Sequence, residues 1–306
     1  MKLLLVLNPR SRSGRGRTLW RGCCGALRRR GVGFDIMMCE PARSIAEAVR
    51  ERDLGIYDAA VAVGGDGTIN GVLDGLASRD DHNAALGVLY SGTSPDFCRF
   101  HGIPTEINES VEALVTGIRR RIDVAGISYR SAGGAGRRAH FGCSSNIGMG
   151  AQVARRSNRL RGSIGDTLGT ATAVLATLAR GKTYDLRIRL DGRELGVRRV
   201  NNLFVLKNPH IASGLHLDLG ASANDGLLRV VCISGLTRAG LLRLLPSFYD
   251  GTALASPGVT IHQCREIEIE ADERLAIEFD GDARGFLPAR IVLRPSAIEL
   301  VGSRHA

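Results

Sequence analysis

The first 120 residues alternate short apolar runs with amphipathic segments, and this alternation constrains the fold more than any other feature of the chain. The apolar runs KLLLVLN, GFDIMMC, YDAAVAVGG and ALGVLY are expected to be strands, and helices are expected at residues 17–30, SIAEAVRER, residues 68–77 and NESVEALVTG. Such alternation predicts a mainly parallel, doubly wound sheet covered by helices. Ligands of these sheets bind at the carboxyl ends of the strands.

From about residue 121 the pattern changes to short, often alternating strands. IDVAGISYR, YDLRIRLDGRE, GLLRVVCIS and ARIVLRP are examples, and helices are expected only near 163–180 and 237–249. This pattern is typical of an antiparallel β-sandwich. We therefore expect an α/β domain over residues 1–121 and a β-sandwich over residues 122–306. The last strand of the sandwich, AIELVG, is a candidate to pack back on the first domain.

The chain carries a net charge of +10, with arginine clusters at 28–30, 119–121 and 155–162. Positive charge favours polyanions such as nucleotide phosphates or an anionic lipid surface. Nucleic acid is not expected as a partner, because aromatic residues make up only 5% of the chain and no nucleic-acid-binding module is recognisable.

The seven cysteines show none of the spacings of zinc or redox sites, so they are expected to be reduced packing residues. The N-terminal apolar run is too short for a secretory segment, and TAVLATLA is too short to cross a bilayer. We expect a cytoplasmic protein that associates peripherally with the inner face of the membrane.

The segment VAVGGDGTING joins an expected strand to an expected helix. Gly64, Gly65 and Gly67 lie at this turn, where bare backbone N–H groups and the positive end of a helix favour a phosphate. Thr68 can cap the helix or donate to the phosphate, and Asp66 can bind a metal ion or orient a water molecule. The structural alternative is a tight turn with a capping residue.

Two further loops follow expected strands and are suited to phosphate. NPRSRSGRG follows the first strand, and YSGTS, with Gly92 and Thr93, follows the fourth. Since the carboxyl ends of parallel strands share one edge of a sheet, we expect the three loops to meet.

Together these motifs resemble the diacylglycerol kinase catalytic-domain superfamily, which includes bacterial lipid kinases and the sphingosine and ceramide kinases, with NAD kinases as more distant relatives. The resemblance continues in order through DFCRFHGIP, NIGMGAQV, SANDGLLRVV and IEFDGDARGFLPARIVLRPSAIELV. It covers almost the whole chain and is specific for the superfamily rather than for the substrate.

The resemblance implies ATP and Mg²⁺ as cofactors. It implies nucleotide contacts from three loops, namely Asn8, Pro9, Arg10, Ser11 and Arg12, then Gly64, Gly65, Asp66, Gly67, Thr68, Ile69, Asn70 and Gly71, and finally Gly92 and Thr93. It implies a structural Mg²⁺ held by Asp225 with the main-chain oxygens of Ser222 and Leu227.

The catalytic carboxylates implied by the resemblance are Asp280 and Asp282, with Asp66 completing a Mg²⁺–water network at the ATP phosphates. Transfer of a phosphoryl group to an alcohol needs a carboxylate that accepts the hydroxyl proton, together with metal and cations that neutralise the phosphate. A strand would place Asp280 and Asp282 on one face, unless Gly281 turns the chain. Which carboxylate takes the proton stays open.

Several residues depart from the superfamily pattern. Tyr90 stands for a proline, Pro95 for an asparagine, Cys39 for a threonine, Gly150 for an aspartate and Asp282 for a glutamate. The changes at residues 90 and 95 are expected to bear on the local geometry, on nucleotide preference and on the choice of acceptor.

The leading hypothesis is an ATP- and Mg²⁺-dependent lipid kinase that docks on an anionic membrane surface. It would phosphorylate a hydroxyl of a membrane lipid, either diacylglycerol or a ceramide or sphingoid base. The alternatives are a kinase of a soluble hydroxyl substrate, as in NAD kinase, and a catalytically idle regulator that binds lipid or nucleotide. The sequence leaves the oligomeric state open, with a homodimer among the alternatives.

Overall fold

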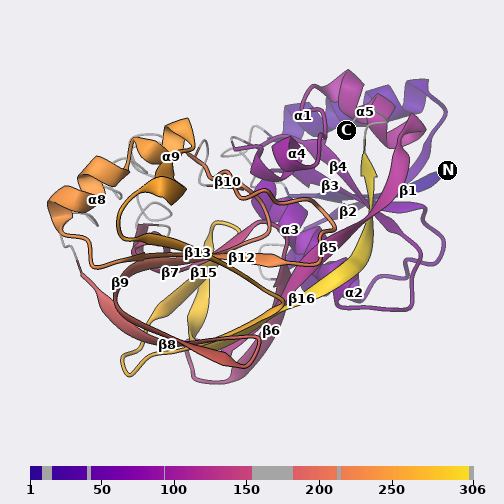
Figure 1. The fold of residues 1–306 in the computed structure, drawn as a ribbon. Helices are drawn as coiled ribbons and strands as arrows, with labels where there is room; N and C mark the ends of the chain where they lie inside the picture. The colour runs from indigo at the N-terminus through magenta and orange to yellow at the C-terminus, as the bar shows by residue number, and fades with distance from the viewer. Residues whose placement is uncertain (9–15, 40–42, 93, 154–181, 212–214, 303–306) are drawn as a thin grey trace. The chain divides into compact units, whose positions relative to one another are not determined.

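The computed structural model describes residues 1–8, 16–39, 43–92, 94–153, 182–211 and 215–302. The chain divides into two compact units (Figure 1), with Met1–Val124 and Arg294–Ala306 in unit 1 and Ala125–Leu293 in unit 2. Two long strands, β5 (Ile118–Arg130) and β16 (Asp282–Gly302), contribute residues to both units. The predicted arginine cluster at 155–162 and the predicted helix near 163–180 lie outside the described residues.

Unit 1 is built on a parallel sheet in the order β2-β1-β3-β4-β16. The strands preceding β5 are β1 (Lys2–Leu7), β2 (Gly33–Met38), β3 (Ala59–Gly64) and β4 (Ala85–Tyr90). At the far end of β16, Leu300 pairs with Leu86 of β4. Strands β3 and β4 are buried along their whole length, as expected for parallel strands that are covered on both faces.

Helices cover the parallel sheet in two groups. They are α1 (Gly16–Arg29), α2 (Ile45–Arg50), α3 (Asp66–Ala77), α4 (Asp96–Phe100) and α5 (Ile107–Thr116). Helices α1 and α5 pack together over alternate strand residues, including Leu5 and Val61. Helices α2 and α3 form the second group, in which Gly75 allows close contact because a Cβ atom there would lie 2.6 Å from Val49. The predicted doubly wound α/β architecture is confirmed.

Unit 2 is an antiparallel β-sandwich, as predicted. Its main strands are β6 (Gly136–Phe141), β7 (Ser144–Gly148), β8 (Tyr184–Leu190), β9 (Arg193–Leu206), β12 (Leu228–Ser234), β13 (Val259–Cys264), β14 (Glu266–Glu270) and β15 (Ala276–Phe279). They run in the order β13-β12-β9-β7-β15-β16, and β8 and β14 link β9 to β16. Alternate strand residues such as Phe141, Leu203, Ile267 and Phe279 form the apolar core.

A second apolar cluster lies under the helical segment of unit 2. This segment comprises α8 (Arg238–Leu244), α9 (Ser247–Asp250) and the 3₁₀ turn η2 (Ala253–Ala255). Leu241, Leu244 and Phe248 are buried against Val231 and Ile233 of β12. The helical segment therefore has one buried apolar side and one side toward solvent.

All seven cysteines are free thiols and six of them are buried, so the prediction of packing cysteines is confirmed. In the parts of the chain that the structure describes, none of the helices has the length and apolar character needed to cross a membrane.

Candidate active site

The ends of three strands in unit 1 bring the predicted phosphate loops together. The register pairs Gly64 of β3 with Tyr90 of β4, and Ser91 N–H donates to the Gly64 carbonyl over 2.8 Å. Asn8, which follows β1, donates from Nδ2 to Thr68 Oγ1 over 3.5 Å. The predicted contacts at residues 9–12 and 93 lie outside the described residues.

Helix α3 begins directly at the glycine turn. Gly65 has an extended backbone and precedes the first helical residue, Asp66, and Ile69 N–H donates to the Gly65 carbonyl over 3.0 Å. The first backbone N–H groups of a helix have no acceptor within the helix, and the helix dipole makes this end positive. The turn therefore presents N–H groups and partial positive charge at the carboxyl end of β3.

The glycines of this turn serve different purposes. A Cβ atom at Gly64 would lie 2.3 Å from Thr68 Oγ1, and one at Gly65 would lie 3.0 Å from the Gly92 Cα atom. Packing within the protein therefore requires these two glycines. At Gly67 no described atom lies within 4 Å of the Cβ position, and the backbone is not left-handed. Since neither packing nor conformation calls for glycine at position 67, its bare main chain leaves room for a ligand.

The other predicted contacts of this loop point into the protein. Thr68, Ile69 and Asn70 are each at most 3% exposed. A Cβ atom at Gly71 would lie 2.7 Å from the Ile45 Cβ, so this glycine serves the contact between α2 and α3. The open part of the loop is thus its beginning, around Gly67.

Tyr90, which departs from the superfamily pattern, lies beside this loop. A Cβ atom at Gly92 would lie 2.5 Å from the Tyr90 hydroxyl oxygen, so Gly92 accommodates the ring. Burial and the nearby charge of Asp66 raise the pKa of Tyr90 above its usual range. The tyrosine is therefore a neutral phenol close to the acidic residue at the start of α3.

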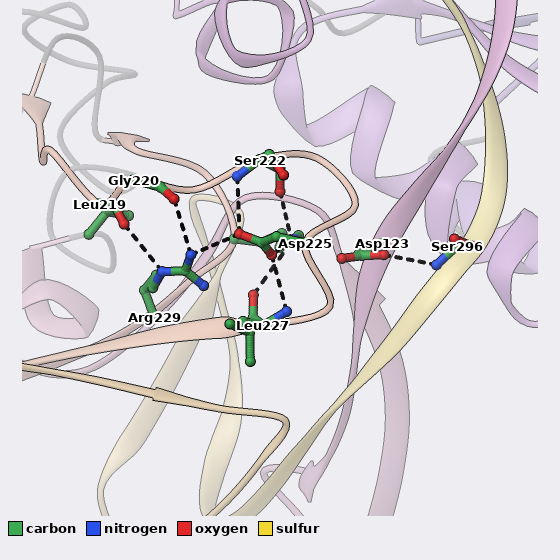
Figure 2. A network of polar contacts seen from close by, with 9 residues as sticks. Asp123, Leu219, Gly220, Ser222, Asp225, Leu227, Arg229 and Ser296 are labelled. Atoms are coloured by element: carbon green, nitrogen blue, oxygen red, sulfur yellow. Dashed lines mark hydrogen bonds and ion pairs between the residues drawn. The ribbon is translucent and has the colours of Figure 1, made fainter.

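In unit 2, the three predicted Mg²⁺ ligands converge on the ammonium group of Lys207 (the Asp225 network is shown in Figure 2). Lys207 Nζ lies 2.5 Å from Asp225 Oδ1, 2.9 Å from the Ser222 carbonyl and 3.5 Å from the Leu227 carbonyl. Its side chain is 1% exposed. Mg²⁺ would have to lie about 2.0–2.1 Å from these same oxygens, where the Lys207 ammonium group now is. The residues present therefore do not fit the predicted structural metal ion.

Asp225 is held by four donors in total. Besides Lys207 it accepts from the backbone N–H groups of Ser222 and Leu227, each over 3.1 Å, and from Arg229 Nη2 over 2.8 Å. Burial alone would raise the pKa of Asp225, but the hydrogen bonds from Lys207 and from the backbone outweigh it and lower the pKa. Across the described residues, no cluster of three or more histidine, cysteine, aspartate and glutamate side chains is arranged to hold a metal ion.

The acidic motif at the end of β15 forms a hairpin turn. Asp280 and Gly281 have φ values of 46° and 87°, as in a two-residue type I′ turn. The Asp280 carboxylate accepts from the N–H groups of Gly142, Cys143 and Ser144 over 2.9–3.0 Å. Of the two alternatives that the sequence left open, the structure shows the second, in which Gly281 turns the chain between the two aspartates.

Asp282, on the other side of the turn, is in a different environment. Its side chain is 54% exposed and lies 3.5 Å from Arg284 Nη2. The Asp282 carboxylate is open to solvent beside Arg284, whereas three backbone N–H groups donate to the carboxylate of Asp280. The structure thus distinguishes two aspartates that the sequence could not.

Glu278, a residue that the sequence analysis missed, lies next to this turn. It is 3% exposed, accepts from the Gly281 N–H over 2.5 Å, and accepts a further hydrogen bond from Asn146 Nδ2. Burial raises the pKa of Glu278 to about 8 from its ordinary value of 4.5. The sequence of β15 does not indicate that Glu278 is buried. An alternating strand would expose it between the buried residues Ile277 and Phe279.

The Glu278→Gln variant is expected to remove one part of the pH dependence of stability. In the wild type the folded state binds more protons than the unfolded state between pH 4.5 and about 8, so stability falls as the pH rises through this window. A neutral glutamine avoids this loss, which we expect to be on the order of a few kcal/mol by pH 8. The free energy of unfolding in urea at pH 5 and pH 8 measures the effect. Glu194→Gln, at a side chain that is 83% exposed, is the control and should change neither value.

Comparisons with known proteins agree with this geometry. The family described as "Diacylglycerol kinase catalytic domain" matches residues 2–127, and "YegS C-terminal NAD kinase beta sandwich-like domain" matches residues 143–302. A diacylglycerol kinase of Mycobacterium tuberculosis (strain CDC 1551 / Oshkosh) is 27% identical over 99% of this chain and 96% of its own length. One from Bacillus subtilis (strain 168) is 26% identical over 82% of this chain and 80% of its own length.

Two solved structures from Bacillus anthracis str. Sterne share the fold. One has a TM-score of 0.78 at 19% identity and covers 99% of this chain and 96% of its own. The other, described as a diacylglycerol kinase, has a TM-score of 0.69 at 18% identity and covers 99% and 97%. The chain has a parallel sheet that ends in a glycine turn, followed by an antiparallel sandwich, and the two family matches occur in the same order. The chain therefore belongs to the diacylglycerol kinase family of lipid kinases, which phosphorylate an alcohol acceptor.

Proposed function

We propose that this protein transfers the γ-phosphoryl group of ATP to the free hydroxyl of diacylglycerol. The observation that carries the proposal is the open main chain at Gly67, in the first turn of α3 where three strand ends meet. The choice of diacylglycerol is supported by the names of relatives that align over nearly the whole chain.

In this proposal the chain's own residues divide the work between binding and proton transfer. The N–H groups at the start of α3 bind the phosphates. Asp66, the first residue of α3, would be the carboxylate that holds a Mg²⁺ ion bound with the nucleotide, and this ion would neutralise phosphate charge. Asp282 accepts the proton of the lipid hydroxyl, while Asp280 positions the turn that carries it.

Transfer of radiolabelled phosphate from ATP tests the proposal. The acceptors are mixed micelles that contain diacylglycerol, ceramide or sphingoid base, with NAD as a soluble alternative. We expect Mg²⁺-dependent labelling of diacylglycerol, with any labelling of ceramide at least tenfold slower. Labelling of NAD alone would identify a kinase of soluble substrates, and folded protein that labels no acceptor would identify an idle regulator.

We also propose that the solvent side of α8 and α9 docks on an anionic bilayer. Leu242 is 50% exposed and Tyr249 is 67% exposed. Arg238 and Arg243 are exposed in the same segment. Exposed apolar side chains in the same segment as exposed arginines suit the boundary between acyl chains and anionic headgroups.

The double variant Leu242→Ser/Tyr249→Ser is expected to lose about tenfold in affinity for phosphatidylglycerol vesicles, because it removes the apolar part of this contact. Co-sedimentation at low and high salt measures the loss, and wild-type binding should itself weaken at high salt. Ile261→Ser, at a residue of β13 that is 40% exposed, is the matched control and should bind as the wild type does. Unchanged binding of the double variant would place the docking surface elsewhere.

A further inference from the structure

A buried lysine in unit 2 occupies a site built from oxygen atoms. Lys207 directly follows β9, and its N–H donates to the Cys143 carbonyl over 2.9 Å, which fixes the start of the side chain. The ammonium group then reaches the carboxylate of Asp225 and the carbonyls of Ser222 and Leu227. Two main-chain carbonyls and a carboxylate are oxygen ligands of the kind that Ca²⁺ and Mg²⁺ prefer.

The cluster already holds two cations for its one carboxylate. Asp225 lies between two buried cations, Lys207 at 2.5 Å and Arg229 at 2.8 Å. Arg229 also donates to the carbonyls of Leu219 and Gly220 over 3.2 Å each (Figure 2). A divalent ion would add two further positive charges and would displace the Lys207 ammonium from its acceptors, which is costly for a side chain that is 1% exposed.

The loop itself depends on this cation. The segment from Ser222 to Leu227 turns at Gly226, whose φ is 72°, so that two carbonyl groups point toward the same place. Converging carbonyl dipoles repel one another unless a cation lies between them. The Lys207 ammonium supplies that positive charge from within the chain.

We propose that Lys207 is a built-in cation that takes the place of a structural divalent metal ion in this loop. The loop is therefore ordered without bound metal, and removing metal ions leaves the fold intact. This inference concerns stability and does not depend on the proposed kinase function, since Mg²⁺ carried by a nucleotide is a separate matter.

The Lys207→Ala variant tests the proposal through thermal unfolding of the nucleotide-free protein. The melting temperature of the wild type should be the same in EDTA as in millimolar Mg²⁺ or Ca²⁺. Lys207→Ala should melt lower in EDTA and should gain about 4 °C or more when Ca²⁺ or Mg²⁺ is added, because the emptied oxygen set can bind the ion. Adding Asp225→Asn to Lys207→Ala should remove that gain.

A matched lysine and a binding measurement complete the experiment. Lys182→Ala, at an exposed lysine paired with Glu273, should show neither the lower melting temperature nor the response to metal. Mn²⁺ binding followed by electron paramagnetic resonance should show a bound ion in Lys207→Ala that the wild type lacks. A wild type that loses stability in EDTA or binds Mn²⁺ as the variant does would overturn the proposal, and so would a folded Lys207→Ala without a metal response. If Lys207→Ala does not fold, the two wild-type measurements decide.

Discussion

Replacing Gly67 with valine is expected to abolish phosphoryl transfer from ATP while the protein folds as the wild type does. No described atom lies within 4 Å of the Cβ position at residue 67, so the protein itself has room for the larger side chain. The change also costs no helix propensity, because glycine is less favourable than valine in a helix. A phosphate bound to the main chain at this turn would collide with it, and we expect kcat/KM to fall by at least about 100-fold.

Two other glycines make the Gly67 result specific. Gly136→Val lies on an exposed part of β6, where no described atom is within 4 Å either, and it should change neither activity nor melting temperature. Gly65→Val should lower the melting temperature, because its Cβ atom would meet the Gly92 Cα at 3.0 Å. Measured together, thermal unfolding and ATP binding separate a blocked ligand site from a damaged fold. A Gly67→Val enzyme with wild-type kcat/KM would show that phosphate does not bind at this turn.

The parts of the fold that the sequence predicts are those coded by local patterns. The apolar runs of β3 and β4 and the glycine turn before α3 are all local in the sequence, so the α/β architecture followed from them. The strands of unit 2 alternate with period two, as YDLRIRL does in β8, and this was enough to predict a sandwich. In both units, strands occur where the spacing of apolar residues along the sequence predicted them.

The chemistry of individual charged residues could not be predicted in the same way, because it depends on contacts between distant segments. Lys207 follows an apolar strand, as a solvent-exposed lysine would, and only the fold brings Asp225 to it. Glu278 carries a raised pKa because the fold buries its carboxyl group, and the hydrogen bond from Asn146, far away in the sequence, lowers the pKa without outweighing burial. The resemblance implied that Ser222, Asp225 and Leu227 are the ligands of a metal ion, but it gave no sign that a lysine donates to all three of these residues.

The two aspartates of the acidic turn are expected to separate activity from stability. Asp282→Asn removes an exposed carboxylate that pairs with Arg284, and an exposed ion pair contributes at most about 1 kcal/mol. If Asp282 is the base, its loss should reduce kcat by about 100-fold to 10,000-fold, with the melting temperature nearly unchanged.

Asp280→Asn is expected to act mainly on stability, and the two asparagine variants are matched controls for one another. Asparagine tolerates the left-handed conformation of residue 280, so the backbone is not strained by the change. In the wild type, the two carboxylate oxygens accept three backbone N–H groups. In Asp280→Asn an NH₂ group replaces the oxygen that accepts from Gly142 N–H, and the remaining amide oxygen cannot accept all three hydrogen bonds. One unsatisfied N–H group costs about 1–3 kcal/mol of the free energy of unfolding, which urea titration resolves.

If Asp280→Asn instead keeps full stability and loses turnover, while Asp282→Asn keeps its turnover, the proton acceptor is Asp280 and the assignment is reversed. The division between the two residues rests on the three amides that already occupy Asp280, since a carboxylate held by three N–H groups is a poor acceptor for a fourth proton donor.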